Sequence, residues 1–385
     1  MKLNRTASLF LSIALLASVV VGYSTTANAA GNPNCNAVDG DYIVSFAPGV
    51  SVDKEIKAAP GRAINAKFKY DKALNGFAAS LSAEQACAFQ KRPNIESIEL
   101  DGIVTSDAVS SWGLDRVDQT ALPLDQSYSF TSSGVGVTAY VIDTGILLNH
   151  NEFSGRATWG TNTTGDAQDT DCNGHGTHVS GTIGGNTFGI AKSVDLVAVK
   201  VLGCNGSGSW SGVIAGINWV IGNHTTSKAV ANMSLGGSAS SSIDTAITNL
   251  VNDGVVTVVA AGNDGRDACK SSPARAPKAI TVAASDSADL LASFSNYGKC
   301  VDVIAPGVGI TSSVNSSSTA SATWSGTSMA SPHVAGVVAR FLQNNAWTTI
   351  GSIPSTLFTS NKITLTAAAK TSGTPNKLIY MAPAN

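Results

Sequence analysis

The stretch GTSMASPHVAGVVARFL, residues 326–342, decides how the second half of the chain folds. Its apolar residues Val334, Val337 and Leu342 recur at helical spacing, which predicts a buried helix with Ser328 in its first turns. The start of a helix offers unpaired N–H groups and the positive end of the helix dipole, so an oxyanion beside Ser328 would be stabilised. A serine at such a place is usually only a helix cap, and other stretches must decide its role.

Buried strands alternate with helices ahead of this stretch. GVGVTAYVID at 134–143 is a near-continuous apolar run, typical of a parallel strand covered on both faces, and VDLVAVKVL at 194–202 is another. A helix is predicted at 211–220. This alternation predicts a doubly wound α/β domain with a largely parallel sheet. The first run ends at Asp143, which places a carboxylate at the end of a strand where such sheets bind ligands.

Two histidines, His175 and His178, lie in DCNGHGTHVSGT at 171–182. A zinc site would need the Glu of H-E-x-x-H and a third ligand, and neither is evident. A dinucleotide fingerprint would need a third glycine where Val179 stands. Neither alternative therefore explains this motif.

Three motifs in one order, YVIDTG, NGHGTHVSGT and GTSMASPH, resemble the signature blocks of the subtilisin-like serine proteases. Four further segments resemble the proteinase K branch of that family, close to aqualysin-type secreted enzymes: WGLDRVDQ, VANMSLGG, VVAAGND and ASFSNYG. The resemblance runs from about residue 105 to the C-terminus, with a weaker match to the family's propeptide upstream. It implies a subtilisin-like fold and a serine endopeptidase that hydrolyses peptide bonds through an acyl-enzyme.

The resemblance also implies a role for each catalytic residue. Ser328 is the nucleophile, His175 is the general base that takes and returns its proton, and Asp143 accepts the Nδ1–H of His175. Asn263, in AAGN, donates to the oxyanion together with the Ser328 N–H. His178 is expected to be structural. No cofactor is expected to be needed for catalysis.

Peptide substrates are expected to bind as an added strand and to place one side chain in a primary specificity pocket. The resemblance gives the substrate edge as Gly206, Ser207 and Gly208, and the pocket walls as Ser234, Leu235, Gly236 and Ala260, Ala261, Gly262. These walls are small residues without an evident charge. The expected preference before the cut is therefore broad, favouring apolar or aromatic residues.

Calcium is expected as a structural ion. Oxygen-bearing side chains cluster near the predicted mature N-terminus and suit calcium, although solvated loop acids would give the same pattern: Asp115, Asp118, Gln119 and Asp125. The resemblance favours an ion there and implies a second site at Asp302, with the backbone carbonyls of Pro277 and Ala279. The acids Asp166, Asp169 and Asp171 are expected to be solvated loop charges rather than another calcium site.

The six cysteines are an even count, which fits an oxidising compartment, and spacing alone leaves fifteen pairings open. The resemblance implies two bridges in the mature enzyme, Cys172–Cys204 and Cys269–Cys300. Cys35 and Cys87 are then expected to pair within the propeptide.

Residues 1–29 are predicted to be a secretory signal peptide. Lys2 and Arg5 form a basic start, residues 9–21 an apolar run, and Ala-Asn-Ala at 27–29 a small-residue cleavage site. The apolar run is short for a spanning helix, which argues against an uncleaved anchor. The mature protein is therefore expected to be secreted, extracellular and not held in a membrane.

Residues 30–106 are predicted to form a small α+β unit in the order β-α-β-β-α-β, a split βαβ arrangement. Ser82 and Gln85 form a capping box at the start of its second helix. The unit is similar to the inhibitory propeptide of subtilisin-like enzymes, and an accessory domain that stays attached is the alternative. Its tail at 101–108 is expected to lie in the active-site cleft and to be cut by the enzyme between residues 104 and 111, leaving a catalytic domain at 107–385.

Composition argues against a nucleic-acid partner, because only 13% of residues are charged and the net charge is −2. The expected partners are polypeptide substrates and the propeptide, and a monomer is expected. An α/β-hydrolase esterase would order its triad as serine, acid, histidine and would need glycine where Ala330 stands. A catalytically dead binding protein on the same fold is disfavoured, because each catalytic position carries the expected residue type.

Overall fold

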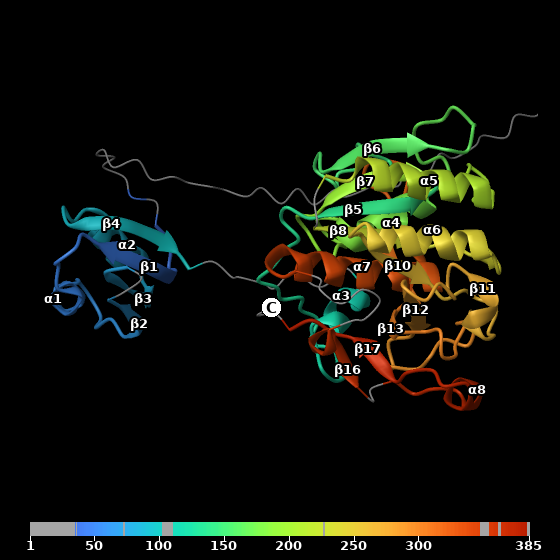
Figure 1. Cartoon of the computed structure of the whole chain (residues 1–385). Coiled ribbons are helices and arrows are strands. Elements are labelled where there is room, and N and C mark those ends of the chain that lie inside the picture. The colour runs from blue at the N-terminus through green and yellow to red at the C-terminus, as the bar shows by residue number, and fades with distance from the viewer. Residues whose placement is uncertain are drawn as a thin grey trace, which may run out of the picture. The chain divides into compact units, whose positions relative to one another are not determined.

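Two units make up the chain, which is described here by a computed structural model covering residues 35, 37–71, 74–101, 111–225, 228–346, 354–360 and 363–382 (Figure 1). The division falls between Thr105 and Ser106. The predicted signal peptide lies outside the described residues. So do residues 102–110, which contain most of the predicted cleavage region.

The first unit is an antiparallel four-stranded sheet with two helices, in the strand order β2-β3-β1-β4. Its elements are β1 (Gly40–Phe46), α1 (Val52–Lys57), β2 (Ala66–Tyr70), β3 (Gly76–Leu81), α2 (Ala83–Gln90) and β4 (Ile95–Leu100). Phe46, Phe77 and Phe89 are fully buried, with 5.4–6.1 Å between ring centroids. The Ser82–Gln85 capping box starts α2. The predicted α+β order is confirmed.

The second unit is built on a nine-stranded sheet in the order β16-β17-β13-β12-β10-β8-β5-β7-β6. The strands are β5 (Thr138–Asp143), β6 (Ala157–Asn162), β7 (Asp195–Lys200), β8 (Ala229–Met233), β10 (Val256–Ala260), β12 (Ile280–Ser285), β13 (Val303–Pro306), β16 (Phe358–Ser360) and β17 (Lys377–Ile379). Neighbours from β17 to β6 pair in parallel, whereas β16 runs antiparallel to β17. The predicted, mostly parallel sheet is confirmed.

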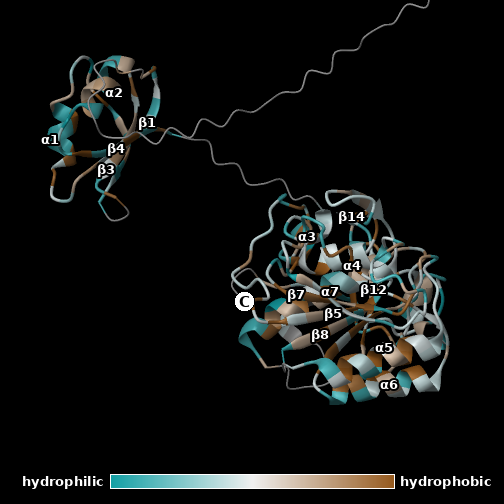
Figure 2. Cartoon of the chain, turned by 90° about the horizontal axis from the view of Figure 1, so that it is seen from above, coloured by the Kyte–Doolittle hydropathy of each residue, from teal (hydrophilic) through white to brown (hydrophobic). Residues whose placement is uncertain are grey.

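Helices cover both faces of this sheet (Figure 1). On one face are α4 (His175–Gly184) and α7 (Thr327–Asn344), and on the other are α5 (Trp210–Asn223) and α6 (Ser241–Asn252). Successive residues of β5 enter opposite cores, because Ala139 and Val141 belong to the cluster with α4 and α7, whereas Tyr140 and Ile142 belong to the one with α5 and α6. Figure 2 shows the apolar strands β5 and β8 within this arrangement. Burial on both faces explains the apolar strand sequences.

Shorter elements complete the second unit: α3 (Trp112–Val117), the strand pairs β9 (Gly237–Ser238) with β11 (Ser271–Ser272) and β14 (Ile310–Ser313) with β15 (Ser321–Trp324), the 3-10 turns η1 (Ala268–Lys270) and η2 (Ser355–Leu357), and α8 (Ala367–Thr371). The predicted closing segment at 377–380 contains β17, whereas 363–366 forms only an isolated bridge through Thr364. Among the described residues, the helices are all too short or too polar to cross a membrane.

The sheet has a topological switch point at β5. Strands β7 and β6 lie on one side of β5, and β8, β10, β12 and β13 lie on the other. At such a point the loops that leave adjacent strand ends diverge and open a crevice. Asp143 ends β5 and Ser234 follows β8, so both residues lie at this crevice.

Candidate active site

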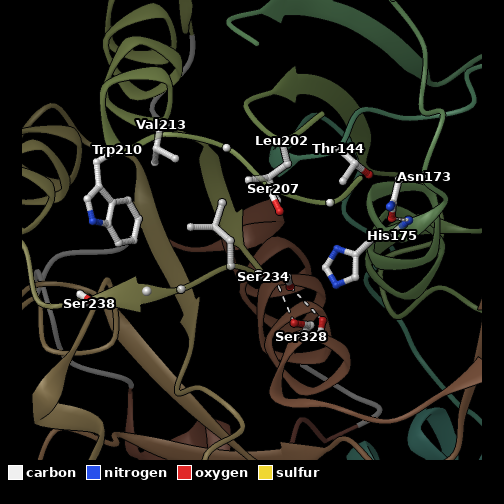
Figure 3. Close-up of a pocket in the computed structure, with 15 residues that line it drawn as sticks. Thr144, Asn173, His175, Leu202, Ser207, Trp210, Val213, Ser234, Ser238 and Ser328 are labelled. Atoms are coloured by element: carbon white, nitrogen blue, oxygen red, sulfur yellow. Dashed lines mark hydrogen bonds between the residues drawn. The ribbon is translucent and has the colours of Figure 1, made fainter. Parts of the chain in front are cut away.

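Three side chains from separate elements meet at this crevice, and Figure 3 shows two of them, His175 and Ser328. Asp143 is the last residue of β5, His175 is the first residue of α4, and Ser328 is the second residue of α7. His175 and Ser328 line one cavity of about 530 Å³, and the fully buried Asp143 contacts the His175 ring. The structure thus brings the three predicted residues to one place.

Asp143 and His175 form a close pair. Nδ1 of His175 lies 2.7 Å from Oδ1 of Asp143, and this oxygen also accepts the N–H of Thr144 at 2.7 Å. Burial alone would lower the pKa of His175, but the charge and the hydrogen bond of Asp143 outweigh it, and the pKa is raised. The Nδ1–H is therefore held by Asp143, and the lone pair of Nε2 is left to accept a proton.

The hydroxyl of Ser328 points toward the end of a neighbouring strand, β8. Its Oγ donates to the carbonyl of Ser234 at 3.1 Å, and the Ser234 hydroxyl donates to the carbonyl of Ser328 at 2.8 Å (Figure 3). Within the described part of the chain, Ser328 makes no hydrogen bond to His175. Its O–H must therefore turn from Ser234 to Nε2 before a proton can pass. Catalytic hydrogen bonds often tighten only in the substrate complex.

Asn263 follows β10 and faces the start of α7. Its Oδ1 accepts the N–H of Thr327 at 2.8 Å and the Thr327 hydroxyl at 2.9 Å. Because a backbone N–H can only donate, these bonds fix the orientation of the amide and direct Nδ2 away from Thr327. The Ser328 N–H lies in the first turn of α7, where no helical acceptor exists. Two donors are therefore available for an oxyanion next to Ser328.

Asp171 corrects a sequence-based expectation, because it is 3% exposed rather than solvated. Its carboxylate accepts the N–H groups of Asn173, Gly174 and Thr177 at 2.8–3.0 Å. It also accepts the hydroxyls of Thr144 and Thr177 at 2.9 and 2.6 Å. These bonds hold the start of α4, and with it His175, against the segment that follows β5.

His178 and His333 are buried and neutral. Nε2 of His178 lies 3.1 and 3.2 Å from the carbonyls of Ile310 and Ala322, and Nδ1 of His333 lies 2.8 Å from a carbonyl one helical turn earlier. Burial lowers the pKa of both histidines to about 4. The ring of Trp324 stacks on His178 with 4.6 Å between centroids. The structure therefore gives His178 the expected structural role.

The predicted substrate-binding residues line two adjoining cavities. The cavity with His175 is lined, among others, by Gly206, Ser207, Gly208, Ser234, Leu235 and Gly236. A second cavity of about 430 Å³ contains Ser328 and Asn263, and its lining includes Leu235, Gly236, Ala260, Ala261 and Gly262. The second cavity is the candidate primary pocket, and Ser234 lines only the first.

Sequence reasoning missed the charged part of this primary pocket. Asp264 and Arg266 line the second cavity, together with Ser271 and Ser272, so the expectation of walls without charge is wrong. The sequence does place both charged residues directly after Asn263. It does not indicate whether their side chains turn into the pocket or toward solvent.

Buried oxygen atoms without a partner are found among the predicted calcium ligands. Oδ1 of Asp115 and Oδ1 of Asp118 are buried and accept no hydrogen bond. Their second oxygens accept the N–H groups of Gln126 and Ser129 at 2.8 and 2.7 Å. Partial burial and the neighbouring carboxylates raise the pKa of Asp118 to about 6. These oxygens fit a calcium ion, which prefers such hard ligands.

The other predicted calcium ligands are only partly gathered. Gln119 Oε1 accepts the N–H of Asp125 at 3.2 Å. Partial burial raises the pKa of Asp302 to about 6, and Oδ2 of Asp302 accepts the N–H of Thr281 at 2.8 Å. Pro277 and Ala279 lie just before β12, next to the strand that Asp302 precedes.

One compact group of possible metal-binding side chains occurs among the described residues, and the sequence did not predict it as a site. The group consists of Asp166, Cys172 and Cys204, whose ligand atoms lie within 4.8 Å of one another. Its two cysteines form a disulfide and have no thiolate to offer a metal. This group is therefore not a metal site.

All six cysteines are paired, as Cys35–Cys87, Cys172–Cys204 and Cys269–Cys300. The second bridge joins the segment before His175 to the segment before the substrate edge. Beside it, Nδ2 of Asn173 donates to the carbonyl of Cys204 at 3.0 Å. The segments that carry His175 and the predicted substrate edge are therefore linked covalently.

Two protein-family models match this chain, one over each unit. The model of the subtilase family matches residues 134–378, and the model of the peptidase inhibitor I9 family matches residues 59–107. The chain belongs to the subtilase family, as a serine protease with an I9 inhibitor propeptide. The predicted family membership is confirmed.

Individual relatives are similar over most of the chain. The chain is 56% identical over 280 residues to the extracellular serine proteinase of Thermus sp. (strain Rt41A), which covers 71% of this chain and 68% of that protein. It is 46% identical over 327 residues to alkaline serine exoprotease A of Vibrio alginolyticus, covering 82% of this chain and 60% of that protein. A crystal structure of a cold adapted subtilisin-like serine proteinase matches with a TM-score of 0.66 and 49% identity, covering 70% of this chain and 97% of that one.

Proposed function

We propose that this chain is a secreted serine endopeptidase that cleaves polypeptides through an acyl-enzyme, with Ser328, His175 and Asp143 as its triad. Oγ of Ser328 attacks the carbonyl carbon of the scissile bond while Nε2 of His175 takes the hydroxyl proton. Asp143 stabilises the imidazolium that forms. His175 then gives the proton to the leaving amine as the C–N bond breaks. Water, activated by the same histidine, hydrolyses the acyl-enzyme and frees Ser328.

The negative charge of each tetrahedral intermediate develops beside two donors, Nδ2 of Asn263 and the N–H of Ser328. Because the Asn263 amide is already oriented by Thr327, these donors need no reorganisation when the charge forms. This arrangement supports transition-state stabilisation at the acyl carbon.

The observation that carries the proposal is the 2.7 Å pairing of His175 with buried Asp143 at the cavity that contains Ser328. A fluorophosphonate probe tests it, with the labelled residue mapped by mass spectrometry. Label on Ser328 is expected, and it should be lost in His175→Ala but kept in the matched control His224→Ala, which changes a histidine outside both substrate cavities. Failure of folded wild-type protein to take up label would contradict the proposal.

We propose further that the precursor consists of a signal peptide at 1–29, an inhibitory propeptide at 30–106 and a catalytic domain at 107–385, and that the enzyme itself cuts between the last two. The I9 match, which ends at residue 107, supports a boundary in this region. A Ser328→Ala chain should keep its propeptide when no other protease is present. Normal cleavage of that variant would show that another protease does the processing.

The substrate class proposed is unfolded polypeptide bound as an added strand along Gly206–Ser207–Gly208, with an apolar or aromatic residue in the primary pocket. The small residues Ala260, Ala261 and Gly262 on the pocket wall support this preference. Digestion of a peptide library tests it, and cuts placed without regard to the preceding residue would contradict it. The mature enzyme is proposed to be extracellular and monomeric.

Calcium is proposed as a structural ion and not as part of the catalytic step. Asp115, Asp118, Gln119 and Asp125 would hold one ion, which would neutralise the orphaned oxygens of the first two residues. Asp302, with the carbonyls of Pro277 and Ala279, would hold another. Bound calcium supplies charge neutralisation that stabilises the folded chain.

A further inference from the structure

The primary pocket contains an ion pair that a purely apolar preference does not explain. Arg266 and Asp264 line the 430 Å³ cavity beside Ser328, and no other charged side chain lines it within the described part of the chain. Nη2 of Arg266 lies 3.1 Å from Oδ2 of Asp264, and the two side chains are 51% and 59% exposed. Both charges are therefore open to a bound side chain.

The loop that carries this pair is fixed from behind by Asn296, which is fully buried. Oδ1 of Asn296 accepts the N–H of Asp264 at 3.1 Å and the N–H of Arg266 at 3.0 Å. Gly262, which precedes the loop, has a φ of 102°, and a Cβ there would lie 2.3 Å from Nδ2 of Asn296, so only glycine fits. The main chain of both charged residues is thus held in one place relative to the oxyanion donor Asn263.

The guanidinium of Arg266 contacts a residue of the primary pocket, and some of its N–H donors bind no partner among the described residues. Its Nη2 donates to Oγ of Ser271 at 3.3 Å, and Ser271 lines the second cavity but not the one that contains His175. Among the described residues, no partner binds Nη1 or Nε of Arg266. Two of the three guanidinium nitrogens are therefore available to a substrate side chain that ends in an acceptor.

We propose that Arg266 determines the charge that the primary pocket accepts, by binding the carboxylate of a glutamate that precedes the cut. A guanidinium presents paired donors that match a carboxylate, whereas a lysine side chain of the substrate would be repelled. Asp264 opposes Arg266 and keeps the preference modest. Substrates therefore include peptides with glutamate at this position as well as apolar residues. The inference rests on the proposed function, because it concerns the same pocket.

Four peptide p-nitroanilides that differ only in the residue before the cut, phenylalanine, glutamate, glutamine or lysine, test this inference. Because Arg266 is half exposed, its pair with a substrate glutamate is worth little more than a surface ion pair. Arg266→Ala should therefore lower the ratio of kcat/KM for the glutamate peptide to that for the phenylalanine peptide by about threefold to fivefold. Asp264→Asn should raise this ratio above that of the wild type. Arg266→Lys should give a ratio between those of the wild type and Arg266→Ala. Salt at about 1 M should lower the ratio in the wild type but not in Arg266→Ala.

Lys270→Ala is the matched control, because it removes a nearby exposed cation that lines neither cavity. It should leave the glutamate-to-phenylalanine ratio unchanged. If Arg266→Ala also leaves this ratio unchanged while phenylalanine turnover is intact, Arg266 does not determine specificity. If the wild type cleaves none of the four peptides, the proposed endopeptidase function is wrong, and the inference that rests on it is withdrawn with it.

Discussion

Replacing Asp171 with asparagine would test how His175, the proposed general base, is held. The carboxylate accepts three backbone N–H groups and two hydroxyls at 2.6–3.0 Å. An amide oxygen in place of Oδ1 keeps the bonds from Thr144, Asn173 and Gly174. The NH2 group in place of Oδ2 faces the N–H of Thr177, another donor. One charge-assisted hydrogen bond is lost outright, the one with the Thr177 hydroxyl must reverse its direction, and the other three become neutral.

The expected loss of stability follows from these bonds. The bond lost outright, to a charged group, contributes about 1.5–3 kcal/mol, so the free energy of unfolding should fall by at least this amount. For a domain of this size, that loss corresponds to a decrease in Tm of about 3–12 °C. The substitution also removes a negative charge that adds to that of Asp143 in raising the pKa of His175. The acidic limb of kcat/KM, which reports loss of a proton from His175, should move to lower pH.

Two measurements check this prediction. Calorimetry of the phosphonate-inhibited protein gives Tm, and p-nitroanilide hydrolysis between about pH 5 and about pH 9 locates the acidic limb. Asp169→Asn, two residues earlier and exposed, is the control and should change neither. A Tm within about 1 °C of the wild type, with an unmoved acidic limb, would refute the reasoning.

Asn263→Ala should lower kcat by a factor of about 10²–10³ and change KM little, the factor being the one known for the equivalent loss in subtilisin. An effect on KM alone would contradict this prediction. Chelation of calcium should lower Tm more at about pH 8 than at about pH 5, because the carboxyls of Asp118 and Asp302 have a pKa raised to about 6, and the folded chain gains stability as they bind protons below that pH. A Tm in chelator that does not depend on pH would overturn this. With calcium bound, the free energy of unfolding should fall as pH decreases from about 6.5 to about 4, because His178 and His333 take up protons in the unfolded chain but stay neutral in the folded one. Urea unfolding at several pH values measures this, and His178→Gln should flatten the profile.

The sequence predicted the central fold because its strands are buried on both faces and therefore read as apolar runs. The apolar runs correctly predicted β5 and β7, where tertiary burial and local composition agree. The same pattern did not predict β6, ATWGTN, because this edge strand is polar and has no apolar run. It also gave no sign of the β14–β15 pair, which forms the carbonyl acceptors around His178. Edge and hairpin strands depend on contacts that composition does not encode.

Residues of the candidate site could be predicted where they stand inside a sequence motif. They could not be predicted where the folded loop determines which way a side chain points. Asp143, His175 and Ser328 stand in motifs, and the structure gathers them at one crevice. Asp171 stands beside one motif, but its burial depends on main-chain N–H groups that only the folded turn directs at it. Arg266 faces the pocket because Asn296, thirty residues later, holds its loop. Such contacts between distant segments leave no local pattern in the sequence.

The segment at 204–209 is exposed, rich in glycine and serine, and without helix or strand, so it offers what a protease seeks in a substrate. It is nevertheless held curled: the N–H of Gly203 donates to the carbonyl of Ser207 at 2.9 Å, and the N–H of Ser207 donates to Oδ1 of Asn205 at 3.0 Å. Cys204 anchors its start to Cys172. To enter the cleft of a second molecule, this segment would have to break these two hydrogen bonds and pull against the anchor at Cys204. We therefore expect the bridge beside His175 to slow digestion of this loop by other copies of the enzyme, and its reduction to speed autolysis there.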